Sequence, residues 1–277
     1  MLFDSHTHIN NEDYTETERE ELAQKIEASK VSYVIDVGFD LSSSMMAVKH
    51  SEKYYWCYAA VGCHPHEARK MDMEQLAMFK GLAKKEKVKA IGEIGLDYYR
   101  NHSPKEEQQI WFHHQIRLAN ELKMPIIIHD RDANQDVLEI LKEEGAFSKE
   151  RCSWFPLRKG VNGEMVKDAR VLLHCYSGSR ELAEQYVKLG ATISIAGPIT
   201  YKNNRKGIEV AKEIPIEFLL VETDAPYLTP EPFRGRQNMS PYVEYTAGKL
   251  AEIKGISFEE VARITCSNAK IFFGVKD

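Results

Sequence analysis

Short apolar runs alternate with amphipathic stretches along most of the chain, and this alternation limits the folds that the sequence can adopt. Runs rich in β-branched residues predict strands at residues 2–8, 31–37, 55–62, 88–93, 125–129, 171–174, 191–195 and 218–222. Strands joined through helices pair in parallel, because each helix returns the chain to the same end of the sheet. Eight such units predict an α/β fold whose sheet closes into a (β/α)8 TIM barrel, with an open doubly wound sheet as the alternative.

The amphipathic stretches predict the helices that would surround such a barrel. They cover residues 18–29, 74–84, 106–122, 134–143, 180–189 and 204–213. The chain has 277 residues, and one barrel of this type takes about 250. Neither a repeat nor a linker rich in proline, glycine and serine interrupts it, so we expect a single domain over residues 1–277.

One helix-to-strand connection, at about residues 145–170, is much longer than the usual ~2–6 residues. In a barrel these connections lie at the N-terminal ends of the strands, whereas active sites lie at the C-terminal ends. We therefore expect this segment to have a structural or subunit-contact role and not to cover a substrate.

Composition argues against several classes of protein. No run of about 18 apolar residues predicts a transmembrane helix, and the N-terminal MLFDSHTH lacks the basic region of a signal peptide. Five cysteines form no CxxC pair, which indicates reduced thiols and a cytoplasmic protein. The net charge of −5 argues against a broadly basic surface, although it is compatible with a local basic patch. We expect no membrane partner, and a monomer or a weak homo-oligomer.

Two histidines in the first predicted strand are the first sign of a metal site. Residues two apart on a strand share a face, so Asp4, His6 and His8 point the same way. Imidazole is the commonest metal-ligating side chain, and two on one strand form half of a site. Buried histidines that bond to the backbone are the alternative, and the pair alone does not decide between the two.

Later predicted strands also end in a histidine or a carboxylate, where the catalytic residues of barrels lie. With the first pair they give six candidate metal ligands: His6, His8, Glu93, His129, His174 and Asp224. Four nitrogens and two carboxylates are more than one tetrahedral ion takes. The set therefore predicts two divalent ions bridged by Glu93, an arrangement that suits phosphoryl chemistry.

Six ordered motifs carry a family resemblance. They are Asp4-Ser5-His6-Thr7-His8, Gly62-Cys63-His64-Pro65-His66, Gly92-Glu93-Ile94-Gly95-Leu96-Asp97-Tyr98-Tyr99, His129-Asp130-Arg131-Asp132-Ala133, His174-Cys175-Tyr176-Ser177-Gly178 and Glu222-Thr223-Asp224-Ala225-Pro226. In this order and spacing, the chain resembles the TatD family of metal-dependent deoxyribonucleases over essentially its whole length. It departs from the family pattern in the 145–170 connection and at residues 236–241, and neither departure changes a candidate ligand.

The resemblance implies a TIM barrel of the metallo-dependent hydrolase type. It also implies the hydrolysis of phosphodiesters, often as a 3′–5′ exonuclease on DNA. By position, His6 and His8 would bind one ion, and His129 and His174 would bind the other. Glu93 would bridge the two ions.

Three residues are candidates for catalysis. Asp224, the ligand implied after the last strand, would orient the attacking water and accept its proton. His64 would donate to the leaving oxygen or hold a phosphate oxygen, and Glu222 would support the ligands or bind a third ion. The cofactors are therefore two divalent ions, or three. Nitrogen-rich ligands suit Zn, whereas carboxylate bridging and phosphate chemistry also suit Mn or Mg.

Basic and aromatic residues follow several of the same strands. The candidates for substrate binding are Arg131, Tyr98, Arg100, Tyr176 and Arg205. Cations can bind phosphates and rings can stack on bases, a combination that suits single-stranded nucleic acid. We expect single-stranded DNA as the favoured partner, with RNA as the alternative.

Two other functions remain open at this point. A metal centre of this kind could hydrolyse a carbonyl substrate, such as an aminoacyl-tRNA ester, a lactone or a cyclic amide, because metal-activated water attacks carbonyls too. The fold could also serve as a non-enzymatic quality-control partner in protein export. A degenerate ligand set would favour that second function, but every expected ligand is present.

Overall fold

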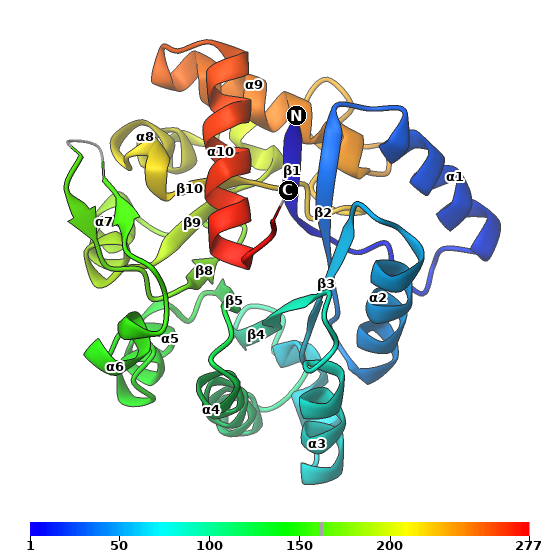
Figure 1. The fold of residues 1–277 in the computed structure, drawn as a ribbon, viewed down its shortest axis with the longest axis vertical. Coiled ribbons are helices and arrows are strands. Elements are labelled where there is room, and N and C mark those ends of the chain that lie inside the picture. Colours follow the sequence, from blue (N-terminus) through cyan, green and yellow to red (C-terminus); the bar gives the residue numbers. More distant parts are fainter. Residues whose placement is uncertain (161–162, 277) are drawn as a thin grey trace.

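The computed structural model describes residues 1–160 and 163–276 and contains one sheet of eight parallel strands (Figure 1). The strand order is β1-β2-β3-β4-β5-β8-β9-β10. The bounds are β1 Leu2–Thr7, β2 Val31–Val37, β3 Cys57–Val61, β4 Val88–Asp97, β5 Ile126–Arg131, β8 Val171–Leu173, β9 Thr192–Ile195 and β10 Leu219–Val221. All eight predicted strands are present, and β4 and β5 run past their predicted ends.

Helices surround the strands, as Figure 1 shows. Their bounds are α1 Glu16–Glu27, α2 Leu41–Lys53, α3 Met73–Leu82, α4 Lys105–Leu122, α5 Asn134–Glu143, α6 Lys149–Ser153, α7 Arg180–Leu189, α8 Arg205–Glu213, α9 Val243–Lys254 and α10 Phe258–Phe273. Four helices lie outside the predicted stretches: α2, α6, α9 and α10. In α2 three serines, which are weak helix formers, follow Leu41, but a capping box between Asp40 and Ser43 starts the helix. Among the described residues, none of the helices is long and apolar enough to cross a membrane.

The sheet closes where β1 meets the end of β10. The backbone N–H of Asp224 donates to the carbonyl of His6 at 2.9 Å, and that of His8 donates to the carbonyl of Ala225 at 2.8 Å. The buried Asp4 carboxylate accepts from the N–H of Thr223 at 2.9 Å and from its hydroxyl at 2.6 Å. These bonds join the first strand to the last, so the predicted barrel is confirmed and the open sheet is excluded.

Apolar packing fills the barrel near its N-terminal end. Phe3, Ile127 and Leu220 from the strands cluster with residues of α10. The ring of Phe3 stacks on that of Phe273, with 5.8 Å between the centroids. In Figure 1, α10 lies across the strands and covers this end. The C-terminal strand ends therefore form the mouth in which a site can open.

The long 145–170 connection contains α6 and a two-stranded antiparallel ribbon of β6 (Arg158–Lys159) and β7 (Met165–Val166). Its side chains bind the chain just before β5 and β8. The fully buried Arg151 donates to the carbonyls of Met124 and Ala169 at 2.8 and 2.9 Å. The segment thus packs at the N-terminal ends of these strands, away from the mouth.

Gly95 allows β4 to approach β5 closely. A Cβ at this position would lie 2.0 Å from the carbonyl oxygen of His129, and the backbone φ of +146° disfavours a side chain as well. We predict that Gly95→Ala lowers the free energy of unfolding by about 1–3 kcal/mol, as overpacking does. Urea unfolding of the metal-free protein would measure the loss.

Gly81→Ala is the matched control. Gly81 lies in α3, and a Cβ there meets nothing within 4 Å. Alanine favours a helix over glycine by about 1 kcal/mol, so this variant should be at least as stable as the wild type. Equal stability of the two variants would contradict the steric role of Gly95.

Candidate metal centre

The structure brings the six predicted ligands together at the mouth of the barrel. His6 lies in β1 and His8 just after it, Glu93 lies within β4 and His129 within β5. His174 and Asp224 follow the ends of β8 and β10. Asp224 has a left-handed backbone, with φ +56°, which is uncommon for a residue other than glycine and is found at functional sites.

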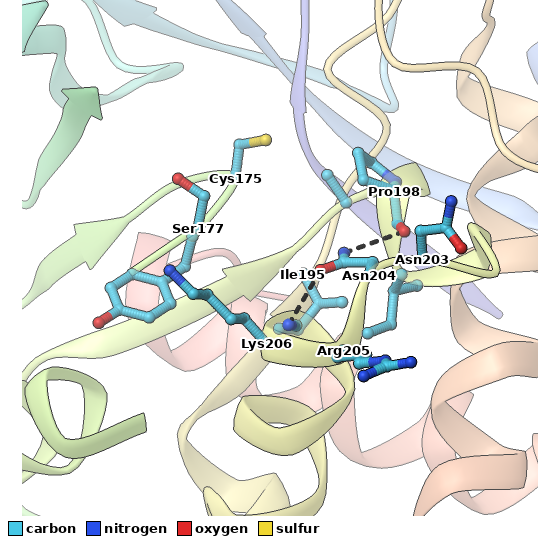
Figure 2. Close-up of a pocket in the computed structure, with 12 residues that line it drawn as sticks. Cys175, Ser177, Ile195, Pro198, Asn203, Asn204, Arg205 and Lys206 are labelled. Carbon is cyan, nitrogen blue, oxygen red and sulfur yellow. Dashed lines mark hydrogen bonds between the residues drawn. The ribbon is translucent and has the colours of Figure 1, made fainter. Parts of the chain in front are cut away.

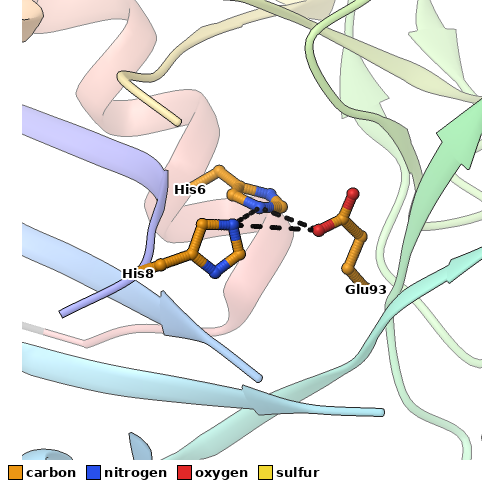
Figure 3. A group of neighbouring side chains, drawn as sticks. All are labelled: His6, His8 and Glu93. Atoms are coloured by element: carbon orange, nitrogen blue, oxygen red, sulfur yellow. Dashed lines mark hydrogen bonds and ion pairs between the residues drawn. The ribbon is translucent and has the colours of Figure 1, made fainter. Parts of the chain in front are cut away.

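A first group of donor atoms consists of His6 Nε2, His8 Nε2, Glu93 Oε2 and Asp224 Oδ1. The two ring nitrogens are 3.2 Å apart, and His6 Nε2 lies 3.4 Å from Glu93 and 3.7 Å from Asp224. His8 Nε2 lies 3.9 and 3.4 Å from the same two carboxylates. Figure 3 shows Glu93 reaching the two rings from the opposite side of the barrel. Ligands of a tetrahedral ion with bonds of ~2.0–2.2 Å are about 3.3–3.6 Å apart, so the donors fit one divalent ion.

A second group gathers around the other oxygen of the same carboxylate. Glu93 Oε1 lies 2.6 Å from His129 Nδ1 and 2.7 Å from His174 Nε2. His64 Nε2 lies 3.6 Å from it. Each oxygen of Glu93 therefore serves one group of histidines, which is the arrangement that a bridging carboxylate requires.

The remaining ring nitrogens test whether these histidines suit a metal. A ligating histidine usually donates its other N–H to a carbonyl or a carboxylate. His8 Nδ1 lies 2.8 Å from the carbonyl of Val37, which can only accept, so His8 Nε2 is free to ligate. His174 Nδ1 faces Glu222 Oε1 at 3.2 Å. The fully buried His6 Nδ1 has no hydrogen-bond partner among the described residues and is the exception.

The histidines and carboxylates of the two groups shift one another's pKa values. Burial would raise the pKa of Glu93, but His174, His64 and the hydrogen bond from His129 hold it well below its usual range. Burial would lower the pKa of His174, but Glu93 and Glu222 raise it well above its usual value. A divalent cation would replace protons on such histidines, so the donor set fits metal ions chemically.

His64 stands beside the second group as a hydrogen-bond donor. Its Nδ1 accepts from the backbone N–H of His66 at 3.1 Å, so in the neutral ring the proton lies on Nε2. Burial and the neighbouring His129 hold the pKa of His64 well below its usual value. A neutral ring that presents an N–H suits the predicted contact to an oxygen of the substrate.

Glu222, the third predicted catalytic residue, is fully buried behind His174. Its Oε1 accepts from His174 Nδ1 and, at 2.7 Å, from the backbone N–H of Cys175. Its donor oxygens also lie near His6 and His174 as a third potential metal-binding group. The sequence left two roles open for Glu222, support of the ligands and binding of a third ion. These hydrogen bonds favour support of the ligands.

Asp97, which was not among the predicted site residues, belongs to the same site. Asp97 Oδ2 lies 2.8 Å from His66 Nε2 and 3.4 Å from His129 Nε2, so it can orient both rings. The hydrogen bonds with His129 and His66 outweigh burial and lower the pKa of Asp97 well below its usual value. The signal that could have found it is the even spacing from Glu93, which places both residues on one face of a regular strand.

The predicted substrate residues fall into two places. Tyr98 is half-buried, and its hydroxyl donates to Asp136 at 2.6 Å. The neighbouring Tyr99 is 60% exposed instead, and the guanidinium groups of Arg131 and Arg100 lie 4.3 and 5.8 Å from its ring centroid. The exposed ring among these cations is thus Tyr99, one residue after the predicted Tyr98.

Tyr176 and Arg205 lie elsewhere, together in a cavity of about 320 Å³ beside Cys175 (Figure 2). Among the described residues this cavity is separate from the exposed ring of Tyr99, which does not line it. The mouth therefore has an exposed basic and aromatic surface near β4 and β5 and a pocket near β8 and β9.

A barrel with two histidine groups that share one carboxylate defines the class of metal-dependent hydrolases. Comparison with known proteins agrees. The family described as TatD related DNase matches residues 3–274, so the chain belongs to the TatD family, as its motifs predicted. It is thus a metal-dependent hydrolase of that family.

Individual relatives cover nearly the whole chain. An uncharacterized metal-dependent hydrolase of Bacillus subtilis, YabD, is 46% identical over 99% of this chain and 100% of its own length. The 3′-5′ ssDNA/RNA exonuclease TatD of Citrobacter koseri is 31% identical over 99% of each chain. The crystal structure of YjjV, a TatD homologue of Escherichia coli, matches with a TM-score of 0.84 and 27% identity over 99% of this chain and 98% of its own.

The shared carboxylate leads to a prediction about metal content. Glu93→Gln replaces a charged group that faces both histidine groups by a neutral amide, which offers one good metal-binding oxygen instead of two. We expect the variant to retain at most half of the divalent metal per chain that the wild type retains after dialysis. Elemental analysis by plasma mass spectrometry would measure it. Glu121→Gln, an exposed residue paired with Lys80, is the control, and equal metal content in both variants would contradict the bridging role.

Proposed function

We propose that the protein is a metal-dependent phosphodiesterase that acts as a 3′–5′ exonuclease on single-stranded DNA or RNA. The observation that carries the proposal is the pair of histidine groups joined by Glu93, since paired divalent ions stabilise the attacking and leaving oxygens of a phosphoryl displacement. The name of the Citrobacter koseri relative supports both the polarity and the single-stranded substrate.

The bound ions would lower the pKa of water and neutralise the charge that develops on the phosphate. His6, His8, Glu93 and Asp224 would hold the first ion, and Glu93, His129 and His174 the second. Burial would raise the pKa of Asp224, but the hydrogen bond with His8 and the nearby His174 and His6 lower it. Asp224 is therefore ionised and can orient an attacking water and accept its proton.

The surroundings of the centre support a polyanionic substrate. The Nε2–H of His64 would bind a phosphate oxygen. The exposed ring of Tyr99 between Arg131 and Arg100 can stack on a base while the cations bind phosphates. Zn, Mn and Mg are all compatible with the donor atoms. The five cysteines are free thiols, which suits a reducing compartment such as the cytoplasm. The proposed partner is nucleic acid and not a membrane, and the proposed state is a monomer or a weak homo-oligomer.

The decisive experiment is digestion of a 5′-labelled single-stranded oligonucleotide with Zn, Mn or Mg added to the metal-free protein. We expect products that shorten one nucleotide at a time from the 3′ end. Asp224→Asn should lower kcat by about 10²–10⁴, the range for loss of an acid–base residue. The exposed Asp13→Asn is the control and should keep wild-type turnover.

Other outcomes would identify the alternatives. Deacylation of charged tRNA without release of nucleotides would contradict the nuclease and favour a carbonyl hydrolase on the same metals. Absence of metal-stimulated turnover on both substrates would favour the non-enzymatic function. An Asp224→Asn variant with full activity would overturn the role of this carboxylate.

A further inference from the structure

The cavity of about 320 Å³ lies between two strand ends beside the metal centre. Its lining consists of Cys175, Tyr176, Ser177, Ile195, Ala196, Pro198, Ile199, Asn203, Asn204, Arg205, Lys206 and Gly207. These residues come from the loop after β8, from the chain after β9 and from the first turn of α8 (Figure 2). Small-molecule sites measure about 300–1,000 Å³. The cavity is therefore large enough for one small ligand but too small for a long segment of a nucleic acid.

The charge of the lining is positive. Arg205 and Lys206 are both exposed, and neither forms an ion pair with a carboxylate among the described residues; Glu209, also in α8, pairs with Arg180 instead. None of the lining residues is acidic. The first turn of α8 adds the partial positive charge of a helix start. In Figure 2 the Lys206 side chain extends from α8 toward the loop that carries Ser177. An anionic ligand therefore matches the rim.

The inner wall is apolar. Ile195 and Ile199 are almost fully buried, at 4% and 2% exposure, and form this wall with Ala196. Tyr176, in the loop after β8, adds an aromatic ring to the lining. An apolar wall with an aromatic ring and a cationic rim suits a base and sugar that carry a phosphate.

Hydrogen bonds hold both walls in place without a ligand. The hydroxyl of Tyr176 donates to the carbonyl of Ser179 at 2.8 Å. The backbone N–H of Tyr176 donates to the carbonyl of Ser194 at 3.1 Å. Asn204 donates to the carbonyl of Pro198 at 3.0 Å and accepts from the N–H of Gly207 at 3.0 Å. A pocket formed in advance loses less conformational entropy when it binds.

Cys175 connects the pocket to the metal centre along the chain. Cys175, which lines it, directly follows the candidate ligand His174. The N–H of Cys175 donates to Glu222 Oε1 at 2.7 Å, and the same oxygen faces His174 Nδ1. A ligand in the pocket would therefore lie beside the phosphate that the metal centre binds.

We propose that this pocket binds one nucleotide of the substrate strand, next to the scissile phosphodiester. Ile195, Ile199 and Tyr176 contact its base and sugar, and Arg205 and Lys206 bind its phosphate. This inference rests on the proposed function, because it needs a nucleic acid at the metal centre. It assigns the recognition of a nucleotide to the pocket and the hydrolysis to the metal centre.

Two substrates separate these roles in the metal-loaded protein. A single-stranded oligonucleotide engages both the pocket and the centre. Bis(p-nitrophenyl) phosphate is a phosphodiester without base or sugar, so its hydrolysis reports on the metal centre alone. The variants are Arg205→Ala/Lys206→Ala, which removes the cations, and Ser177→Trp, which fills the pocket from an exposed position on the rim. The control Lys188→Ala/Lys212→Ala removes two exposed cations near the other ends of α7 and α8.

The expected result is a KM for the oligonucleotide raised at least about fivefold in both pocket variants, and unchanged in the control. The slope of log KM against log salt should fall by roughly 0.7 in the double alanine variant, since the two cations bind one phosphate and each single-strand phosphate contact contributes about 0.7. Hydrolysis of bis(p-nitrophenyl) phosphate should stay within about twofold of wild type.

Failure of the proposed function and failure of the nucleotide pocket would give different results. A wild-type protein that does not cleave the oligonucleotide contradicts the proposed function. A wild type that cleaves it, with pocket variants of unchanged KM, overturns the nucleotide pocket only. Equal loss on both substrates would overturn it as well, because the effect would then lie at the metal centre.

Discussion

The hydrogen bonds between Asp4 and Thr223 hold the first strand of the barrel against the last, and the candidate metal centre depends on this seam. His6 and His8 come from one side of it and Asp224 from the other. Because the backbone of Asp224 bonds to that of His6, closing the barrel also sets the distances among these three donors. Burial outweighs the hydrogen bonds from Thr223 and raises the pKa of Asp4 to about 7. Closure of the barrel therefore also positions three of the four donors of the first group.

Glu93 depends on a second constraint, the close approach of β4 to β5. The hydrogen atom at Gly95 lets the carbonyl of His129 lie where a Cβ would stand. This approach brings both oxygens of Glu93 among the histidines, one oxygen to each group. Asp97, four residues after Glu93, lies 3.4 Å from His129 Nε2 and can orient this ring. Residues 93–97 of β4 therefore supply the bridging carboxylate, the glycine that allows the close approach to β5, and the carboxylate that orients His129.

The loop after β8 links hydrolysis to substrate recognition. Cys175 has a left-handed backbone, with φ +43°, and its N–H binds Glu222. Glu222 therefore fixes both the ring of His174 and the start of the loop that carries Tyr176. Glu222 therefore contacts both a candidate metal ligand and a residue that lines the proposed nucleotide pocket, so it can hold the two in a fixed relation.

The sequence by itself determined the barrel and the set of candidate ligands, because parallel strands bring their C-terminal ends to one place and period-2 spacing places side chains on one face. It did not determine which ring after β4 faces solvent, and in the structure Tyr99 is exposed whereas Tyr98 is half-buried. Local spacing also does not show that His50 binds Asp36, which lies 14 positions away in the sequence and 2.7 Å away in the structure. Such contacts, like those of Asp97 and the pocket between β8 and β9, depend on side-chain directions in loops and on neighbours distant in the chain. Only tertiary packing decides these, because local spacing carries no information about them.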